Sequence, residues 1–155
     1  MAVRKIITGK DNALRKKSRE VTAFDARLHQ LLDDLTDTMH RANGVGLAAA
    51  QVGVLRKAVV VDVGEGVIEL VNPQIIEASK EILCESEGCL SFPGEAGMVK
   101  RPQWVIVRAQ NRMGETITVK GEGLLARALC HETDHTNGII FKDIADEVYQ
   151  EEDEE

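Results

Sequence analysis

The chain has 155 residues, of which 43% are hydrophobic and 29% are charged, and its formal net charge at neutral pH is −7. This length predicts one domain with a sizeable core, and no apolar run is long enough to predict a membrane span or the core of a signal peptide. Three cysteines, an odd number, argue against a disulfide framework and favour a reducing cytoplasm.

The charges gather at the two ends of the chain. Residues 143–155 include eight acids and no Lys or Arg, and the rest of the chain is close to neutral. The first twenty residues instead carry seven basic side chains: Arg4, Lys5, Lys10, Arg15, Lys16, Lys17 and Arg19. We expect a single domain over residues 1–155, with a basic, irregular N-terminal arm (1–20) and an acidic C-terminal tail (about 143–155), both solvated.

The first regular element that we predict is a helix that begins at Thr22 and ends at Gly44. Asp25 stands three positions after Thr22, as in a shorter form of the capping box. An apolar stripe follows at helical spacing: Phe24, Leu28, Leu31, Leu32, Leu35 and Met39. We interpret this helix as scaffold, and His29 and His40 as surface residues.

Small residues dominate the next stretch, residues 44–53, which reads Gly-Val-Gly-Leu-Ala-Ala-Ala-Gln-Val-Gly. Glycines adopt backbone dihedrals that other residues avoid, and small side chains let a second backbone come close. A phosphate-binding loop would require a Gly-Lys-Ser or Gly-Lys-Thr sequence, which does not follow. We therefore predict a bend that presents Gln51 to a pocket.

The middle of the chain predicts extended structure. Residues 58–63 are β-branched and nearly continuous, as in a buried strand. A short strand is predicted to end near Asn72-Pro73, and a further extended segment is predicted at 75–83. Residues 104–111 and 116–120 predict a hairpin, and residues 139–141 predict one more strand. Residues 143–149 predict a helix whose acidic end, at the wrong pole of the helix dipole, should fray.

Residues 124–138 combine a helical pattern with the ligands of a metal site. Apolar residues recur at helical spacing, and Gly138 stands where a left-handed residue commonly ends a helix. His131 and His135, four residues apart, share one face and suit a divalent metal ion, while Asp134 is a candidate for an outer-shell role. Glu132 points aside, where it can reach water as a general base. The alternative to a metal site is a surface helix that carries two histidines and a glutamate by chance. That alternative leaves the four-residue spacing of the histidines unexplained.

Together these elements predict an α+β fold, with small mixed or antiparallel β-sheets packed around a central helix that carries His-Glu-x-x-His. The third metal ligand decides the kind of site. One protease pattern places a third His where this chain has Phe141, and another uses a later Glu, which here would have to come from the acidic tail. The remaining candidate for the third ligand is Cys89, which lies in a loop bounded by Gly and Pro. A Cys-His-His site leaves the fourth coordination position of the metal open to water.

Three motifs, in this order, resemble those of the peptide deformylase family: Gly-Val-Gly-Leu-Ala-Ala-Ala-Gln at 44–51, Glu-Gly-Cys-Leu-Ser at 87–91 and His-Glu-Thr-Asp-His at 131–135. The likeness extends from about Leu14 to Phe141. One departure is Cys130, because the family usually has Gln before the first His. On a helix Cys130 points about 100° away from His131, so we expect altered packing beside the site and no lost ligand.

The resemblance implies a single catalytic domain that removes the formyl group from the N-terminal formylmethionine of new polypeptides and releases formate. It implies one divalent metal ion held by Cys89, His131 and His135, with iron(II) as the ion in the cell and zinc or nickel as substitutes. The expected location is the cytoplasm. The expected partners are nascent polypeptides and, transiently, the ribosome, with no membrane and no specific nucleic acid.

The resemblance also implies roles for residues around the metal. Glu132 would move the proton between water and the leaving amine. The Gln51 side-chain amide and the Leu90 backbone N–H would stabilise negative charge on the formyl oxygen. The substrate backbone would bind as an added strand at three positions: Val45, Gly46 and Gly88.

Two other functions remain open on the sequence alone. A metalloendopeptidase of the His-Glu-x-x-His type would need a long cleft and a third His or Glu ligand. A non-catalytic structural zinc domain would use Cys84 and Cys89 with the two histidines. The long stretch between these pairs and the presence of Glu132 and Gln51 argue against such a closed site.

Overall fold

The structure, a computed structural model, describes residues 2–150; Met1 and residues 151–155, the acidic end that we expected to fray, lie outside the described residues. The described chain forms a five-stranded sheet in the order β1-β2-β3-β6-β7 and a three-stranded sheet in the order β4-β5-β8. The strands are β1 (Gly46–Ala48), β2 (Ala58–Val61), β3 (Ile68–Ala78), β4 (Ile82–Gly88), β5 (Glu95–Pro102), β6 (Trp104–Gln110), β7 (Thr116–Glu122) and β8 (Glu147–Gln150). The helical elements are η1 (Asn12–Arg15), α1 (Ala26–Arg41), η2 (Ala49–Val52), α2 (Leu124–Thr136) and α3 (Phe141–Ile144).

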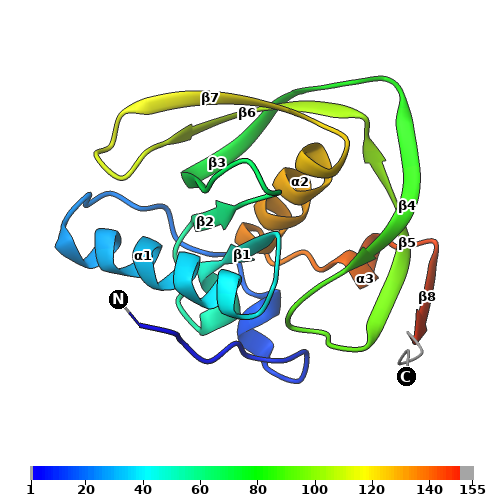
Figure 1. Ribbon diagram of the computed structural model, residues 1–155, viewed down its shortest axis with the longest axis horizontal. Coiled ribbons are helices and arrows are strands. Elements are labelled where there is room, and N and C mark those ends of the chain that lie inside the picture. The colour runs from blue at the N-terminus through cyan, green and yellow to red at the C-terminus, as the bar shows by residue number, and fades with distance from the viewer. Residues whose placement is uncertain (1, 151–155) are drawn as a thin grey trace.

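Figure 1 shows α2 at the centre of the molecule, with the five-stranded sheet on one side and the β4–β5 ribbon on the other. Neighbouring strands within both sheets pair antiparallel. This arrangement confirms the expected α+β fold around a central helix. None of the helices in the described residues is long and apolar enough to cross a membrane.

Strand β2 explains why α1 and α2 cover opposite faces of the large sheet. Successive residues of a strand point to opposite faces. Ala58 and Val60 belong to the core cluster that contains the apolar stripe of α1, whereas Val59 and Val61 belong to the cluster that contains the apolar residues of α2. Each such fully buried Val contributes roughly 1.5–3 kcal/mol. The continuous apolar run at 58–61 is therefore buried on both sides, as expected for this segment.

Helix α1 begins later and ends earlier than predicted. Its N-cap is Asp25, whose carboxylate accepts a hydrogen bond from Leu28 N at 3.1 Å, so Thr22 lies outside the helix. The helix ends at Arg41. Of the two histidines assigned to the surface, His40 is exposed, whereas His29 is half-buried with Nε2 2.7 Å from the Arg112 carbonyl oxygen.

The predicted break at Asn72-Pro73 is wrong, because β3 continues through it. Asn72 has a positive φ of 52° and its side chain bonds to the backbone N and O of Val21, at 2.8 and 2.9 Å. The register against β6 shifts between Val71 and Gln74. A proline lacks an N–H for the ladder, and this irregularity accommodates it.

The end of the described chain also differs from expectation. Residues 139–141 form no strand, since Phe141 begins the short helix α3, and the helix predicted for 143–149 stops at Ile144. Strand β8 follows and pairs with β5. Val148 and Tyr149 have high strand propensity, and pairing satisfies backbone groups on the edge of β5.

Candidate metal centre and active site

Three side chains that bind metal ions in other proteins converge between α2 and the loop after β4. Cys89 Sγ lies 3.3 Å from His135 Nε2, which lies 3.2 Å from His131 Nε2. The three ligand atoms all lie within 4.8 Å of one another. Two imidazole nitrogens that face each other repel unless a proton or a cation lies between them. A thiolate and two imidazoles form a donor set that suits zinc or iron, so the residues present fit a divalent metal ion.

Helix α2 sets the positions of the two histidines. They stand one turn apart on α2, and the apolar residues of this helix pack against the five-stranded sheet, among them Ala126, Leu129 and Cys130. His131 and His135 are themselves buried, while Cys89 is partly exposed. Packing against the sheet therefore holds the ligands in place before a metal ion arrives.

A buried carboxylate orients the first histidine. Glu87 Oε1 accepts a hydrogen bond from His131 Nδ1, which leaves Nε2 of that ring free for a metal ion. Arg101 donates to both carboxylate oxygens, at 2.6 and 3.1 Å, and Arg127 Nη1 donates to Oε2 at 3.0 Å. Burial raises the pKa of Glu87, but hydrogen bonds from His131 and Arg101 outweigh it and lower this pKa to about 2. Glu87 therefore remains ionised at neutral pH.

Sequence reasoning does not find this network. Glu87 belongs to one of the three motifs, but no pattern marks it as the partner of His131, and Arg101 and Arg127 belong to no motif. Only Arg127 offers a signal, since it lies between Ala126 and Ala128 in an apolar helical stretch, where a buried charged side chain needs a partner. Asp134, expected in an outer-shell role, accepts a hydrogen bond from Arg101 Nη1 at 2.7 Å and so joins the same network.

Glu132 is buried beside the ligands, and its Oε1 has no hydrogen-bond partner among the described residues. The backbone of β1 packs closely against it, because a Cβ atom at Gly46 would lie 2.5 Å from Glu132 Oε2. Burial raises the pKa of Glu132 to about 7, although His131 lowers it. A carboxylate with a pKa near neutrality and a free oxygen is suited to accept and return a proton.

Gln51 is also buried, and η2 directs its side chain to the site. Its Oε1 accepts a hydrogen bond from Ala48 N at 3.0 Å, and its Nε2 lies 3.4 Å from Cys89 Sγ and 3.2 Å from Ser91 Oγ. The carbonyl end of the amide is thus fixed, and the N–H end faces the metal ligands.

A cavity of about 330 Å³ opens onto this site. Its wall contains eight of the nine residues singled out from the sequence: Val45, Gly46, Gln51, Gly88, Cys89, Leu90, His131 and Glu132. The ninth, His135, is fully buried beneath them. Leu124, Ala128 and Arg127 complete the wall on the side of α2.

The other two cysteines lie outside the ligand cluster. Cys130 is buried against the large sheet, and burial raises the pKa of its thiol to about 11, so it stays protonated. Cys84 is exposed on β4, with Sγ 4.0 Å from Asp146 Oδ2. It is not among the three residues whose ligand atoms converge. A closed site of two cysteines and two histidines is therefore not formed in the described residues.

We expect Cys84→Ser to bind as much divalent metal as the unchanged protein, because its thiol lies outside the cluster. Cys89→Ser is the matched variant, with the same change of one atom made at a ligand, and its metal content should fall severalfold or more. Elemental analysis of anaerobically purified proteins measures both. Loss of metal from the Cys84→Ser protein would make Cys84 a ligand and contradict this description of the site.

Comparisons with known proteins point to one family. The family model described as polypeptide deformylase matches residues 3–151. Similar proteins include the peptide deformylases of Alkaliphilus metalliredigens, 57% identical over 92% of this chain and 97% of the relative, and of Caldicellulosiruptor bescii, 59% identical over 92% and 86%. The crystal structure of peptide deformylase from Thermotoga maritima superposes with a TM-score of 0.90 at 38% identity, over 92% of this chain and 97% of that one.

Proposed function

Because the chain belongs to the polypeptide deformylase family, metal-dependent hydrolases that remove the N-formyl group from nascent polypeptides, we propose a role for each residue of its pocket in that reaction. Cys89, His131 and His135 hold one divalent metal ion, iron(II) in the cell, with zinc or nickel able to use the same ligands. A bound divalent ion acts as a Lewis acid that lowers the pKa of water. The observation that carries this proposal is the convergence of the three ligand atoms beside the free carboxylate oxygen of Glu132.

Glu132 moves the proton in this mechanism. Its carboxylate takes a proton from water, the water oxygen bonds to the formyl carbon, and the bond from that carbon to the amine nitrogen breaks. Glu132 then gives the proton to the leaving amine, so that formate and a free N-terminus result. The burial of this side chain and its free Oε1 support the role.

Gln51 and Leu90 stabilise the negative charge that develops on the formyl oxygen. The anchored carbonyl end of Gln51 supports this role because it leaves Nε2 directed at the ligands. The backbone N–H of Leu90, next to Cys89, donates no hydrogen bond among the described residues and is free for the same oxygen. Fixed donors of this kind stabilise a transition state without reorganising.

We expect Gln51→Ala to lower kcat by on the order of a hundredfold, the usual cost of one lost oxyanion donor, with little change in KM. Ser91→Ala is the control, since it removes a partner of Gln51 Nε2 but keeps the amide. Formate release from a formyl-Met peptide gives both constants. A kcat for Gln51→Ala within a fewfold of the control would remove Gln51 from the mechanism.

Substrate binds between the two sheets as an added strand. β1 is an edge strand of the large sheet, β4 is an edge strand of the small one, and both border the cavity. Val45 and Gly46 on one side and Gly88 on the other supply backbone groups for pairing. Leu90 and Leu124 offer apolar contacts to the methionine side chain.

The family membership favours this activity over a metalloendopeptidase or a structural zinc domain. The protein acts as a single catalytic domain over residues 1–155. It works in the cytoplasm, where its formylated substrates are made, and contacts the ribosome transiently. The nature of the substrate supports the last two statements, since formyl-Met N-termini emerge only during synthesis.

A further inference from the structure

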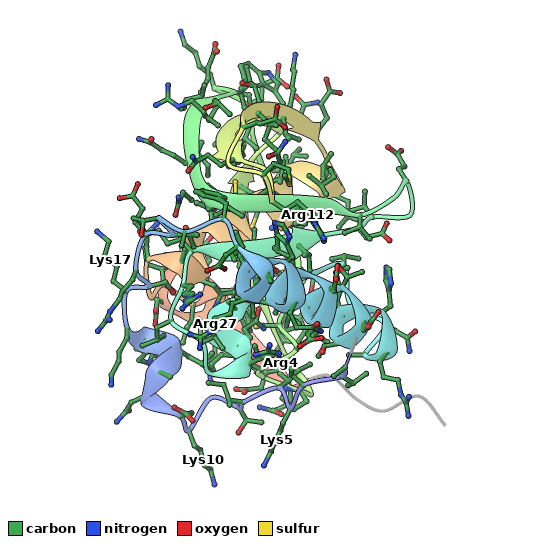
Figure 2. All side chains as sticks on the ribbon, turned by 90° about the vertical axis from the view of Figure 1, so that its left-hand side faces the viewer. Arg4, Lys5, Lys10, Lys17, Arg27 and Arg112 are labelled. Atoms are coloured by element: carbon green, nitrogen blue, oxygen red, sulfur yellow. The ribbon has the colours of Figure 1, made fainter. Side chains whose placement is uncertain are left out.

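A second cleft, of about 300 Å³, is lined by three arginines: Arg4, Arg27 and Arg56. Its other lining residues are Gln30, Leu31 and Val54, and none of the six borders the active-site cavity. The cleft lies where the N-terminal arm, the start of α1 and the turn before β2 meet. Figure 2 faces this side of the molecule and shows Arg4 and Arg27 close together upon it.

Within residues 2–150, two of the three guanidinium groups have no acidic partner. Arg27 and Arg56 are exposed and form no ion pair among the described residues. Asp34 is the acid that contacts the cleft residues Arg4 and Gln30, and its carboxylate oxygens are already engaged. Its carboxylate accepts hydrogen bonds from Arg4 Nε at 2.9 Å, Ala2 N at 2.8 Å and Gln30 Nε2 at 2.7 Å. Asp34 therefore fixes Arg4 at the cleft without neutralising the other two arginines.

The fold places a fourth arginine beside Arg56. Arg19 and Arg56 pair in an isolated parallel bridge, with hydrogen bonds of 2.9 Å from Arg19 N to Leu55 O and from Lys57 N to Arg19 O. Like charges at paired positions destabilise a fold. Both side chains are exposed, and neither has an ion-pair partner in the described part of the chain. An anion bound between them would relieve this repulsion.

Exposed lysines lie on the same side of the molecule as the cleft. Figure 2 shows Lys5, Lys10 and Lys17 pointing outward from the arm, and all three are exposed without ion pairs in residues 2–150. We call the following set the basic face: Arg4, Lys5, Lys10, Lys17, Arg19, Arg27 and Arg56. Against these seven basic side chains stand four acids of the same segments, so the face keeps a positive charge: Asp11, Glu20, Asp25 and Asp34.

We propose that the basic face binds the phosphate backbone of folded RNA, with a phosphate group in the arginine cleft. Guanidinium groups match phosphate oxygens in a fork geometry, and spaced lysines follow a phosphate backbone as point charges. Among the described residues, Tyr149 of β8 is the one exposed aromatic side chain, and it does not belong to the basic face. The basic face therefore offers no aromatic surface on which bases could stack. Its binding is therefore independent of base sequence. The choice of RNA as the anion rests on the proposed function, because nascent chains emerge from an RNA-rich particle.

The test compares two double variants with the same change in net charge. The first variant, Arg27→Glu with Arg56→Glu, reverses two charges at the cleft. The control, Lys80→Glu with Arg108→Glu, reverses two charges at exposed positions away from the cleft, on the β3–β4 turn and on β6. Binding to purified ribosomes and to a labelled ribosomal RNA hairpin is titrated over a range of salt concentrations. We expect the cleft variant to bind both about tenfold or more weakly, with the slope of log affinity against log salt reduced by about two, while the control stays near the unchanged protein.

Equal losses in the two double variants would assign the effect to net charge and overturn the proposal. So would a cleft variant that keeps its RNA affinity but loses binding to vesicles of phosphatidylserine and phosphatidylcholine. Formate release from a short formyl-Met peptide is measured on the same samples and should be unchanged in both. A failure of the catalytic proposal would appear in that assay for every sample, and the comparison of RNA affinities would still stand.

Discussion

Replacement of Glu132 by Gln should leave the metal content unchanged and lower formate release by on the order of a thousandfold. The amide is nearly the same size as the carboxylate, so the packing of β1 against this side chain should survive. It cannot accept a proton from water, and it has none to give to the leaving amine. The measurement is kcat for a formyl-Met peptide, together with the metal content of the same sample.

Glu122→Gln, at the exposed end of β7, is the control for this variant. Near-normal turnover in the Glu132→Gln protein would remove the proposed base, and loss of its metal would mean that Glu132 is a ligand. The pH profile of the unchanged enzyme provides a second check. Burial raises the pKa of Glu132 to about 7, and a nearby divalent cation favours the carboxylate, so kcat/KM should fall as pH drops through a value below 7.

Glu87→Gln should weaken metal binding by about 10–100-fold and lower the free energy of unfolding by about 3–5 kcal/mol. The first effect follows because Glu87 fixes the orientation and tautomer of His131. The second follows because Arg101 and Arg127 would remain buried without the charge that they both contact. Metal titration and chemical denaturation measure the two effects.

The sign of the pH dependence follows from the lowered pKa of Glu87. Its contribution to stability is fully present above the ordinary glutamate value of 4.5 and is lost as pH falls towards about 2. The Glu87→Gln protein should lack this part of the acid dependence. Glu85→Gln, two residues earlier on β4 and exposed, is the matched control and should change neither quantity. Unchanged metal affinity in the Glu87→Gln protein would contradict the orienting role.

The parts of the fold that the sequence predicts well are those specified by local pattern. The apolar run of β2 and the hairpin of β6 and β7 are present as expected, because burial on both faces and a short turn leave clear signals. β5 left no such signal, since Gly97 and Pro102 interrupt it. The local pattern predicts a helix where β8 lies, because the strand forms only by pairing with the free edge of β5, about fifty residues earlier in the sequence.

The candidate site, too, is predictable only where a local pattern specifies it. Cys89, His131 and His135 could be selected by spacing and ligand chemistry, and the structure brings their ligand atoms together. The support beneath them could not be foreseen. Glu87 meets Arg101 and Arg127 only because β4, β5 and α2 pack together, and side-chain pairing over such separations has no signature in a single sequence.

We propose that deformylation by this protein requires a metal ion held by Cys89, His131 and His135. The direct test measures metal content and formate release together on anaerobically prepared protein, before and after removal of the metal with a chelator and after its return as iron(II). We predict about one divalent ion per chain, loss of formate release in step with loss of the ion, and recovery on its return. Formate release at the full rate from metal-free protein would contradict the claim.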